Sequence, residues 1–212
     1  DWGYRTFYEN GRLEFWIRRP PALNPQAPLD NIIVALDPGH GGDETGAVGP
    51  LGLMEKNVNL AWAKKCAALL RQNGAMVVLT RQDDETVSLP ERIQRAEAAN
   101  AHVFISLHNN SVGASGNAFR AAGTSVYFTL PQNKELCWAI YPRMVDVGLA
   151  PYGRIYNSYF VTRSTSFLVA LVEGAFLSNP AEERKLLEDE FVGEIAEAVV
   201  LGLTDFFQQR AQ

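Results

Sequence analysis

Short apolar segments that alternate with amphipathic helical segments are the feature that most restricts how this chain can fold. The strand-like segments, one of them very short, lie at residues 32–36, 76–80, 103–107, 124–130, 160–162 and 167–172. Strands that are apolar at every position are typical of parallel sheets covered on both faces. The alternation therefore predicts an α/β fold: a mostly parallel, twisted sheet of about six strands with helices on both faces.

The predicted helices lie between and after these strands, at residues 55–73, 89–99, 132–149, 180–188 and 191–209. The first repeats apolar residues at helical spacing and is expected to stop at Gly74. The second has Ser88 as its expected N-cap. Because proline lacks the N–H that a helix interior needs, Pro142 is expected to kink or split the third.

The first 30 residues are expected to form a unit of their own. Asn10-Gly11 separates two segments rich in aromatic and β-branched residues, a strong signal for a two-residue β-hairpin turn. Residues 20–30 contain four prolines and are typical of a semi-rigid linker. We predict a hairpin and Pro-rich linker over 1–30, the remnant of a preceding domain, and one catalytic domain over 31–212. A hairpin docked on the main body is the alternative, because two isolated strands are only marginally stable.

Composition excludes two kinds of partner. The 212 residues carry a formal net charge of −5, whereas a chain that binds phosphate backbones usually has a basic stripe. No apolar stretch approaches the length of a membrane span. We therefore expect neither a nucleic-acid partner nor a membrane span. We also expect a monomeric protein.

Chemically versatile side chains follow three of the predicted strands. His40 lies in the glycine-rich stretch "DPGHGG" after the first strand, His108 ends "FISLH", and Glu173 follows "LVALV". Glu55 opens the helix that comes after the first strand. In open α/β sheets ligands bind beyond the carboxyl ends of the strands, so these four residues are expected to meet at one edge.

Two imidazoles and a carboxylate are the ligands of an open, catalytic zinc site. A second carboxylate close to the metal could take a proton from water and pass it to a leaving group. Glycines around His40 would let the backbone turn tightly there. A phosphate-binding loop is the alternative for "GHGGDETG", but the stretch lacks the G-K-[ST] ending of such loops.

Six separated blocks resemble the zinc-dependent N-acetylmuramoyl-L-alanine amidases, bacterial cell-wall hydrolases often called the type-3 amidase domain. They are "DPGHGGDETGAVG", "EKNVNL", "VVLTR", "LPERIQRAEAANA", "FISLHNN" and "LVEGAFLSNPAEERKLL", and the likeness spans about residues 32–207. The resemblance implies one zinc ion bound by His40, Glu55 and His108, with Glu173 as the catalytic residue. It also implies peptidoglycan as the partner, and an extracytoplasmic location reached through an export signal outside this sequence. The substrate bond implied is the amide between N-acetylmuramic acid and L-alanine.

The chain departs from the family pattern at two places. Gly174-Ala175 follows the implied catalytic glutamate where relatives commonly carry Thr-Gly, and His102 stands where an aspartate is usual. We interpret His102 as part of a helix-to-strand connection at the opposite edge of the sheet. Neither departure touches the four site residues.

Two other functions compete with the amidase. A zinc exopeptidase that trims stem peptides would need a cation for a terminal carboxylate, and Arg81, Arg92 and Arg163 are candidates. A non-catalytic module that binds peptidoglycan would have no physical need for three ligands and a further carboxylate. The residues that bind substrate are not predicted by the sequence.

Overall fold

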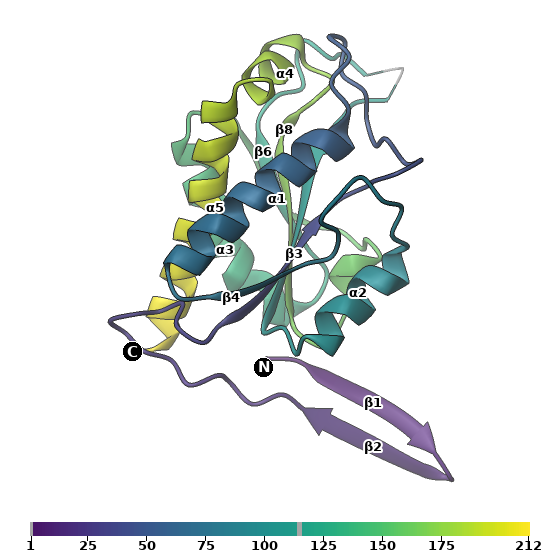
Figure 1. Cartoon of the computed structure of the whole chain (residues 1–212), viewed down its shortest axis with the longest axis vertical. Helices are drawn as coiled ribbons and strands as arrows, with labels where there is room; N and C mark the ends of the chain where they lie inside the picture. The colour runs from purple at the N-terminus through teal and green to yellow at the C-terminus, as the bar shows by residue number, and fades with distance from the viewer. Residues whose placement is uncertain (1, 114–115) are drawn as a thin grey trace.

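A six-stranded sheet forms the centre of the domain in the computed structural model, which describes residues 2–113 and 116–212 (Figure 1). The strand order is β4-β3-β5-β8-β6-β7. All neighbours are parallel except β6 and β8, which run antiparallel. The predicted mostly parallel sheet of about six strands is confirmed. The strands are β3 (Ile33–Pro38), β4 (Met76–Leu79), β5 (Val103–Asn110), β6 (Thr124–Phe128), β7 (Pro151–Tyr156) and β8 (Leu168–Phe176).

Helices cover both faces of the sheet. The helices are α1 (Glu55–Gln72), α2 (Leu89–Ala98), α3 (Lys134–Asp146), α4 (Pro180–Leu186) and α5 (Asp189–Arg210). Alternate residues of β3 enter different cores: Val34 and Leu36 pack with α1 and α5, whereas Ala35 packs with Ala96 of α2. Among the described residues, no helix combines the length and the apolar character needed to cross a bilayer.

Two local predictions are wrong, and the sequence analysis misses one strand. Pro142 does not split the predicted helix: it lies inside α3, which packs against α5 and β6. Residues 160–162 do not form a strand, since 161–163 form the short 3₁₀-helix η2 (Val161–Arg163). The sixth strand is instead β7, an exposed edge strand whose proline and glycine conceal it from pattern analysis.

The N-terminal hairpin is present, formed by β1 (Tyr4–Glu9) and β2 (Arg12–Ile17). Its turn residues Asn10 and Gly11 have φ angles of 51° and 74°, as a type I′ turn requires. The hairpin projects from the domain, while its base contacts the sheet's amino-terminal edge (Figure 1).

The base of this segment is packed against the domain at two points. Trp2 is buried against the rings of Phe206 and Phe207 at the end of α5. Leu29, at the end of the linker, is also buried in the main core. We propose that residue 30 divides the N-terminal segment from the catalytic domain. Removing that segment would also remove the contacts that Trp2 and Leu29 make with the core.

Candidate metal and catalytic site

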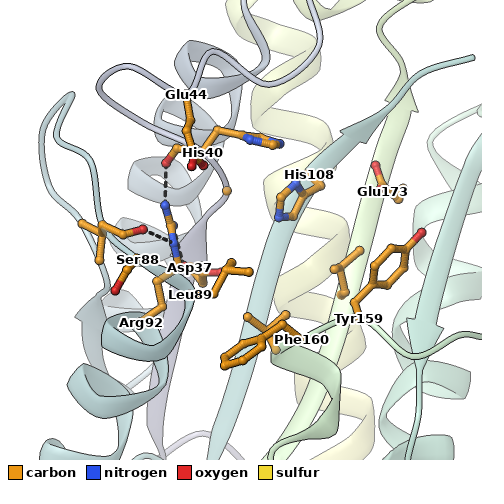
Figure 2. A pocket seen from close by; sticks show the side chains of 14 residues that line it. Asp37, His40, Glu44, Ser88, Leu89, Arg92, His108, Tyr159, Phe160 and Glu173 are labelled. Atoms are coloured by element: carbon orange, nitrogen blue, oxygen red, sulfur yellow. Dashed lines mark hydrogen bonds and ion pairs between the residues drawn. The ribbon is translucent and has the colours of Figure 1, made fainter. Parts of the chain in front are cut away.

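The structure brings all four predicted site residues to the carboxyl edge of the parallel strands. His40 follows β3, Glu55 is the first residue of α1, and His108 lies near the end of β5. Glu173 lies within β8, which continues to Phe176 and does not end before the glutamate as the apolar pattern predicts. His108 and Glu173 are paired in register on neighbouring strands. Figure 2 shows the side chains of His40, His108 and Glu173 around one cavity.

His40, Glu55 and His108 form a compact cluster of metal-ligand types. One donor atom from each residue lies within 4.8 Å of the other two. Glu55 joins the imidazoles: its Oε2 is 3.1 Å from His40 Nε2, and its Oε1 is 3.0 Å from His108 Nδ1. Three protein ligands of this kind, gathered around one point, match the donor set of a catalytic zinc site.

Glu55 and His108 stabilise each other's charged forms: the anionic Glu55 suits a metal, whereas a protonated His108 has to release its proton before it can bind one. Burial by itself would raise the pKa of Glu55, but hydrogen bonds from both imidazoles outweigh it, so the pKa lies well below its usual range. Burial likewise lowers the pKa of His108, yet the hydrogen bond and charge of Glu55 outweigh it and raise the pKa above its ordinary value. Glu55 is therefore held as an anion in the metal-free protein, which is the form that binds a metal.

The glycines beside His40 are explained by close packing. A Cβ at Gly39 would lie 2.1 Å from the His108 ring, so only glycine lets the two ligand segments approach this closely. His40 itself has a φ of 61°, a left-handed conformation that is uncommon for a residue with a Cβ. The backbone around His40 is therefore shaped to bring one imidazole beside the other.

Two buried arginines hold the His40 loop in this shape. Arg81 donates to the carbonyl oxygens of Pro38 and Gly39 at 2.9 and 3.0 Å. Arg92 donates to the carbonyl oxygen of His40 at 2.7 Å and to the Asp37 carboxylate at 2.8 Å. Sequence reasoning considers these arginines only as candidates for substrate binding. Their guanidinium groups are instead committed to the backbone of the loop.

The segment before Glu55 is held by another buried carboxylate that the sequence analysis misses. Glu183 is fully buried and accepts hydrogen bonds from the backbone N–H groups of Leu51 and Leu53 at 2.7 and 3.0 Å. A Cβ at Gly49 would lie 2.1 Å from the Glu183 carboxylate, so that glycine makes room for it. Glu183 thereby fixes the approach of the chain to α1 and to Glu55 at its start.

Glu173 differs from Glu55 in having no hydrogen-bond partner for its buried Oε2 among the described residues. Burial raises its pKa to about 7, with the charge of His108 opposing the shift and that of Glu55 adding to it. An unpaired carboxyl group with a raised pKa, close to metal ligands, is typical of a general acid–base residue.

A cavity of about 380 Å³ lies beside these groups. His40, His108 and Glu173 line one part of it, and Figure 2 shows Leu89 and Phe160 on its other walls. The further apolar lining residues are Val87, Val161 and Leu171. An apolar cavity with a few convergent polar groups is the common form of a substrate pocket. These walls come from the starts of α2 and η2, the residues just before them, and β8, and no sequence pattern pointed to them.

Arg163 does not line this cavity. Its guanidinium lies over the Phe160 ring, 5.4 Å from the centroid, and it lines a separate, neighbouring depression. Arg92 does line the cavity, but its guanidinium is bonded to the Asp37 carboxylate and to the His40 loop, and Arg81 is bonded to the same loop.

Comparisons with known proteins agree with this geometry. Residues 34–205 match the family model described as N-acetylmuramoyl-L-alanine amidase. The chain is 31% identical to YqiI of Bacillus subtilis over 89% of this chain and 91% of that protein. It is 30% identical to the N-acetylmuramoyl-L-alanine amidase LytC of Bacillus subtilis over 85% of this chain, but spans only 36% of LytC.

A solved structure shows the same fold. The N-acetylmuramoyl-L-alanine amidase AmiC2 of Nostoc punctiforme superposes with a TM-score of 0.79 at 32% identity, covering 84% of this chain and 97% of that one. The family match spans both histidines, Glu55 and Glu173, which are the residues that the structure gathers at one edge of the sheet. The chain therefore belongs to the N-acetylmuramoyl-L-alanine amidase family.

Proposed function

We propose that the domain hydrolyses the amide bond between N-acetylmuramic acid and L-alanine, and so releases stem peptides from the glycan strands of peptidoglycan. One zinc ion is held by His40, Glu55 and His108, and Glu173 is the catalytic residue. The observation that carries the proposal is the unpaired Glu173 carboxyl group in the same cavity as the His40–Glu55–His108 cluster.

The residues of the site divide the chemistry between them. A zinc ion held by the cluster would act as a Lewis acid on the scissile carbonyl group and make water a better nucleophile. Glu173 takes the proton of the attacking water on its carboxylate. It then gives that proton to the amide nitrogen as the bond to L-alanine breaks, which restores the carboxylate. A pKa near 7 suits a group that must both accept and return a proton.

The positions of the arginines support the amidase over an exopeptidase. An exopeptidase needs a cation for the terminal carboxylate of its substrate. Arg81 and Arg92 donate to backbone carbonyl groups of the His40 loop, and Arg163 lies outside the cavity.

Peptidoglycan as substrate places the activity outside the cytoplasm, in the periplasm or cell wall. This location follows from the proposed substrate. It also accords with a relative named probable cell wall amidase LytH, of Staphylococcus epidermidis, to which the chain is 33% identical over 85% of this chain and 60% of that protein.

Digestion of purified peptidoglycan followed by mass spectrometry tests the proposal. The expected products are intact stem peptides and glycan strands that carry free lactyl groups, formed only when zinc is present. Shortened stem peptides that remain attached to glycan would indicate an exopeptidase. Binding to peptidoglycan without any new product would indicate a non-catalytic module. A chelator should stop the reaction, and added zinc should restore it.

A further inference from the structure

Two buried asparagines connect the elements that carry the site. Asn59 lies on α1, one turn after Glu55, and Asn109 directly follows His108 in β5. Both side chains are almost completely removed from solvent. Burying an amide is costly unless its polar groups find partners, so the contacts of these two residues need an account.

The contacts form one continuous chain of hydrogen bonds. Asn59 Nδ2 donates to Glu55 Oε1 at 3.2 Å and to the carbonyl oxygen of Gly39 at 3.3 Å. Asn109 Nδ2 donates to Asn59 Oδ1 at 2.9 Å. Asn109 Oδ1 accepts from the N–H of Ala175 at 3.2 Å, and the backbone N–H of Asn109 donates to Glu55 Oε1 at 3.1 Å.

The chemistry of the partners leaves one orientation for each amide. A carboxylate and a carbonyl oxygen can only accept, so Nδ2 of Asn59 must face Glu55 and Gly39. Its Oδ1 must then accept from Asn109, which turns Oδ1 of Asn109 toward the N–H of Ala175. Aspartate or leucine at either position would break this order, because neither side chain has an amide donor.

We propose that Asn59 and Asn109 are positioning residues that orient Glu55 and hold the metal ligands in register with the strand of Glu173. Through Glu55, Gly39 and Ala175 the pair reaches all four segments that carry the site: α1, the His40 loop, β5 and β8. Groups that hydrogen-bond to a metal ligand fix its orientation, and their loss typically costs about 10–100-fold in metal affinity. The proposal deepens the proposed function, since it concerns the same site.

Gly174 belongs to the same arrangement. A Cβ at this position would lie 3.0 Å from Asn109 Oδ1 and 3.0 Å from the ring of Trp62. A larger residue would have to displace the asparagine or the tryptophan. Gly174, directly after Glu173, therefore leaves room for the Asn109 side chain, which accepts a hydrogen bond from the N–H of Ala175.

Zinc affinity of the metal-free protein, measured by competition with a chromophoric chelator, tests the proposal without relying on catalysis. Asn59→Ala is expected to bind zinc about 10–100-fold more weakly than the wild type. Asn109→Ala keeps its backbone N–H bond to Glu55 and loses the bonds to Asn59 and Ala175, so it is expected to bind zinc more weakly by a smaller factor. The matched control is Asn133→Ala. Asn133 is also fully buried and its Oδ1 accepts a backbone N–H, from Val169 at 3.0 Å, but it lies outside the site. The control should lose thermal stability and keep wild-type zinc affinity.

Wild-type zinc affinity in Asn59→Ala and Asn109→Ala would overturn the proposal. An equal loss of zinc affinity in Asn133→Ala would also overturn it, because zinc affinity would then depend on the general stability of the protein. If the alanine variants do not fold, Asn59→Leu and Asn133→Leu repeat the test with nearly unchanged volume and the same expectations. If the wild-type protein binds zinc tightly but has no amidase activity, the proposed function is contradicted. The comparison of zinc affinities then still tests the positioning role of the two asparagines. A wild type that binds no zinc would refute both.

Discussion

The two ends of strand β5 each carry a histidine, and the two residues do different work. His102 precedes the strand at the amino-terminal edge of the sheet, and His108 lies near its carboxyl end. His102 Nδ1 accepts a hydrogen bond from the N–H of Ile33 at 2.9 Å. His108 Nδ1 lies 3.0 Å from a carboxylate, that of Glu55, in a cavity. One histidine completes the backbone hydrogen bonding of the sheet, and the other belongs to a metal-ligand cluster.

Their surroundings shift the two pKa values in opposite directions. Burial lowers the pKa of His102, and the nearby charge of Arg18 lowers it further. At His108 the hydrogen bond and charge of Glu55 overcome the effect of burial and raise the pKa. The two histidines differ in position and surroundings although their residue type is the same. His102 supports the backbone of the sheet at the amino-terminal edge, and we propose that His108 binds the metal at the carboxyl edge.

The largest expected effect is loss of the metal at the carboxyl edge. His108→Ala and His40→Ala should lose bound zinc and all measurable amidase activity, because two protein ligands hold the ion far more weakly than three. His102→Ala is the matched control and should keep about one zinc per chain. Metal analysis of the purified proteins checks this. Full zinc content in His108→Ala would mean that the ligand assignment is wrong.

The second prediction separates the two glutamates of the site. Glu173→Gln keeps the size of the side chain but cannot take a proton, so it should retain zinc and lose on the order of a hundredfold or more in turnover. Glu55→Gln should weaken zinc binding first. The check is zinc content together with kcat for both variants. Zinc loss in Glu173→Gln combined with retention in Glu55→Gln would show that their roles are exchanged.

The third prediction concerns stability at the amino-terminal edge. Trp2 is 7% exposed, and Trp2→Ala should cost about 3–5 kcal/mol in the free energy of unfolding, the usual cost of truncating a buried tryptophan. The matched control is Trp16→Ala on the hairpin, where the side chain is 62% exposed and the cost should be small. Urea unfolding measures both. A lower zinc affinity in Trp2→Ala would contradict the division of roles between the two edges.

Removal of residues 1–30 extends the same test to the proposed boundary. The truncated chain should stay folded and active, because all four site residues lie beyond the cut, but it should unfold at lower urea concentration since Trp2 and Leu29 are lost. Non-cooperative unfolding of the truncated chain would show that the hairpin and linker are an obligatory part of the domain.

The smallest expected effect is a pH dependence of stability from His102. Its folded-state pKa is lowered from the ordinary value of 6.5, so the unfolded chain binds the proton more readily. The neutral His102 side chain therefore contributes to the stability of the folded protein. This contribution is complete above pH 6.5 and is lost as the pH falls through the folded-state pKa of His102. His102→Asn keeps an acceptor for Ile33 but does not titrate, so its free energy of unfolding should fall less between pH 7.5 and pH 5. Equal acid sensitivity of the two proteins would assign the effect to other groups.

The amino-acid sequence by itself determined the elements that carry the site. Apolar segments and helical spacing are local, and they predicted five of the six sheet strands and the start of α1 at Glu55. The rule that parallel strands deliver their following residues to one edge then predicted that His40, His108 and Glu173 would meet. Edge strand β7 escaped because an exposed strand with Pro151 and Gly153 lacks the apolar pattern of the others.

Only the tertiary structure decided how the site is supported. The sequence blocks "EKNVNL" and "FISLHNN" contain Asn59 and Asn109, but nothing local shows that their amides meet. Their mutual hydrogen bond joins residues 50 positions apart, and the bond from Ala175 to Asn109 spans 66. The commitment of Arg81 to the His40 loop likewise depends on segments about 40 residues apart. Local patterns encode which side chains a segment exposes on each face, whereas the partner of a buried polar group depends on how distant segments pack.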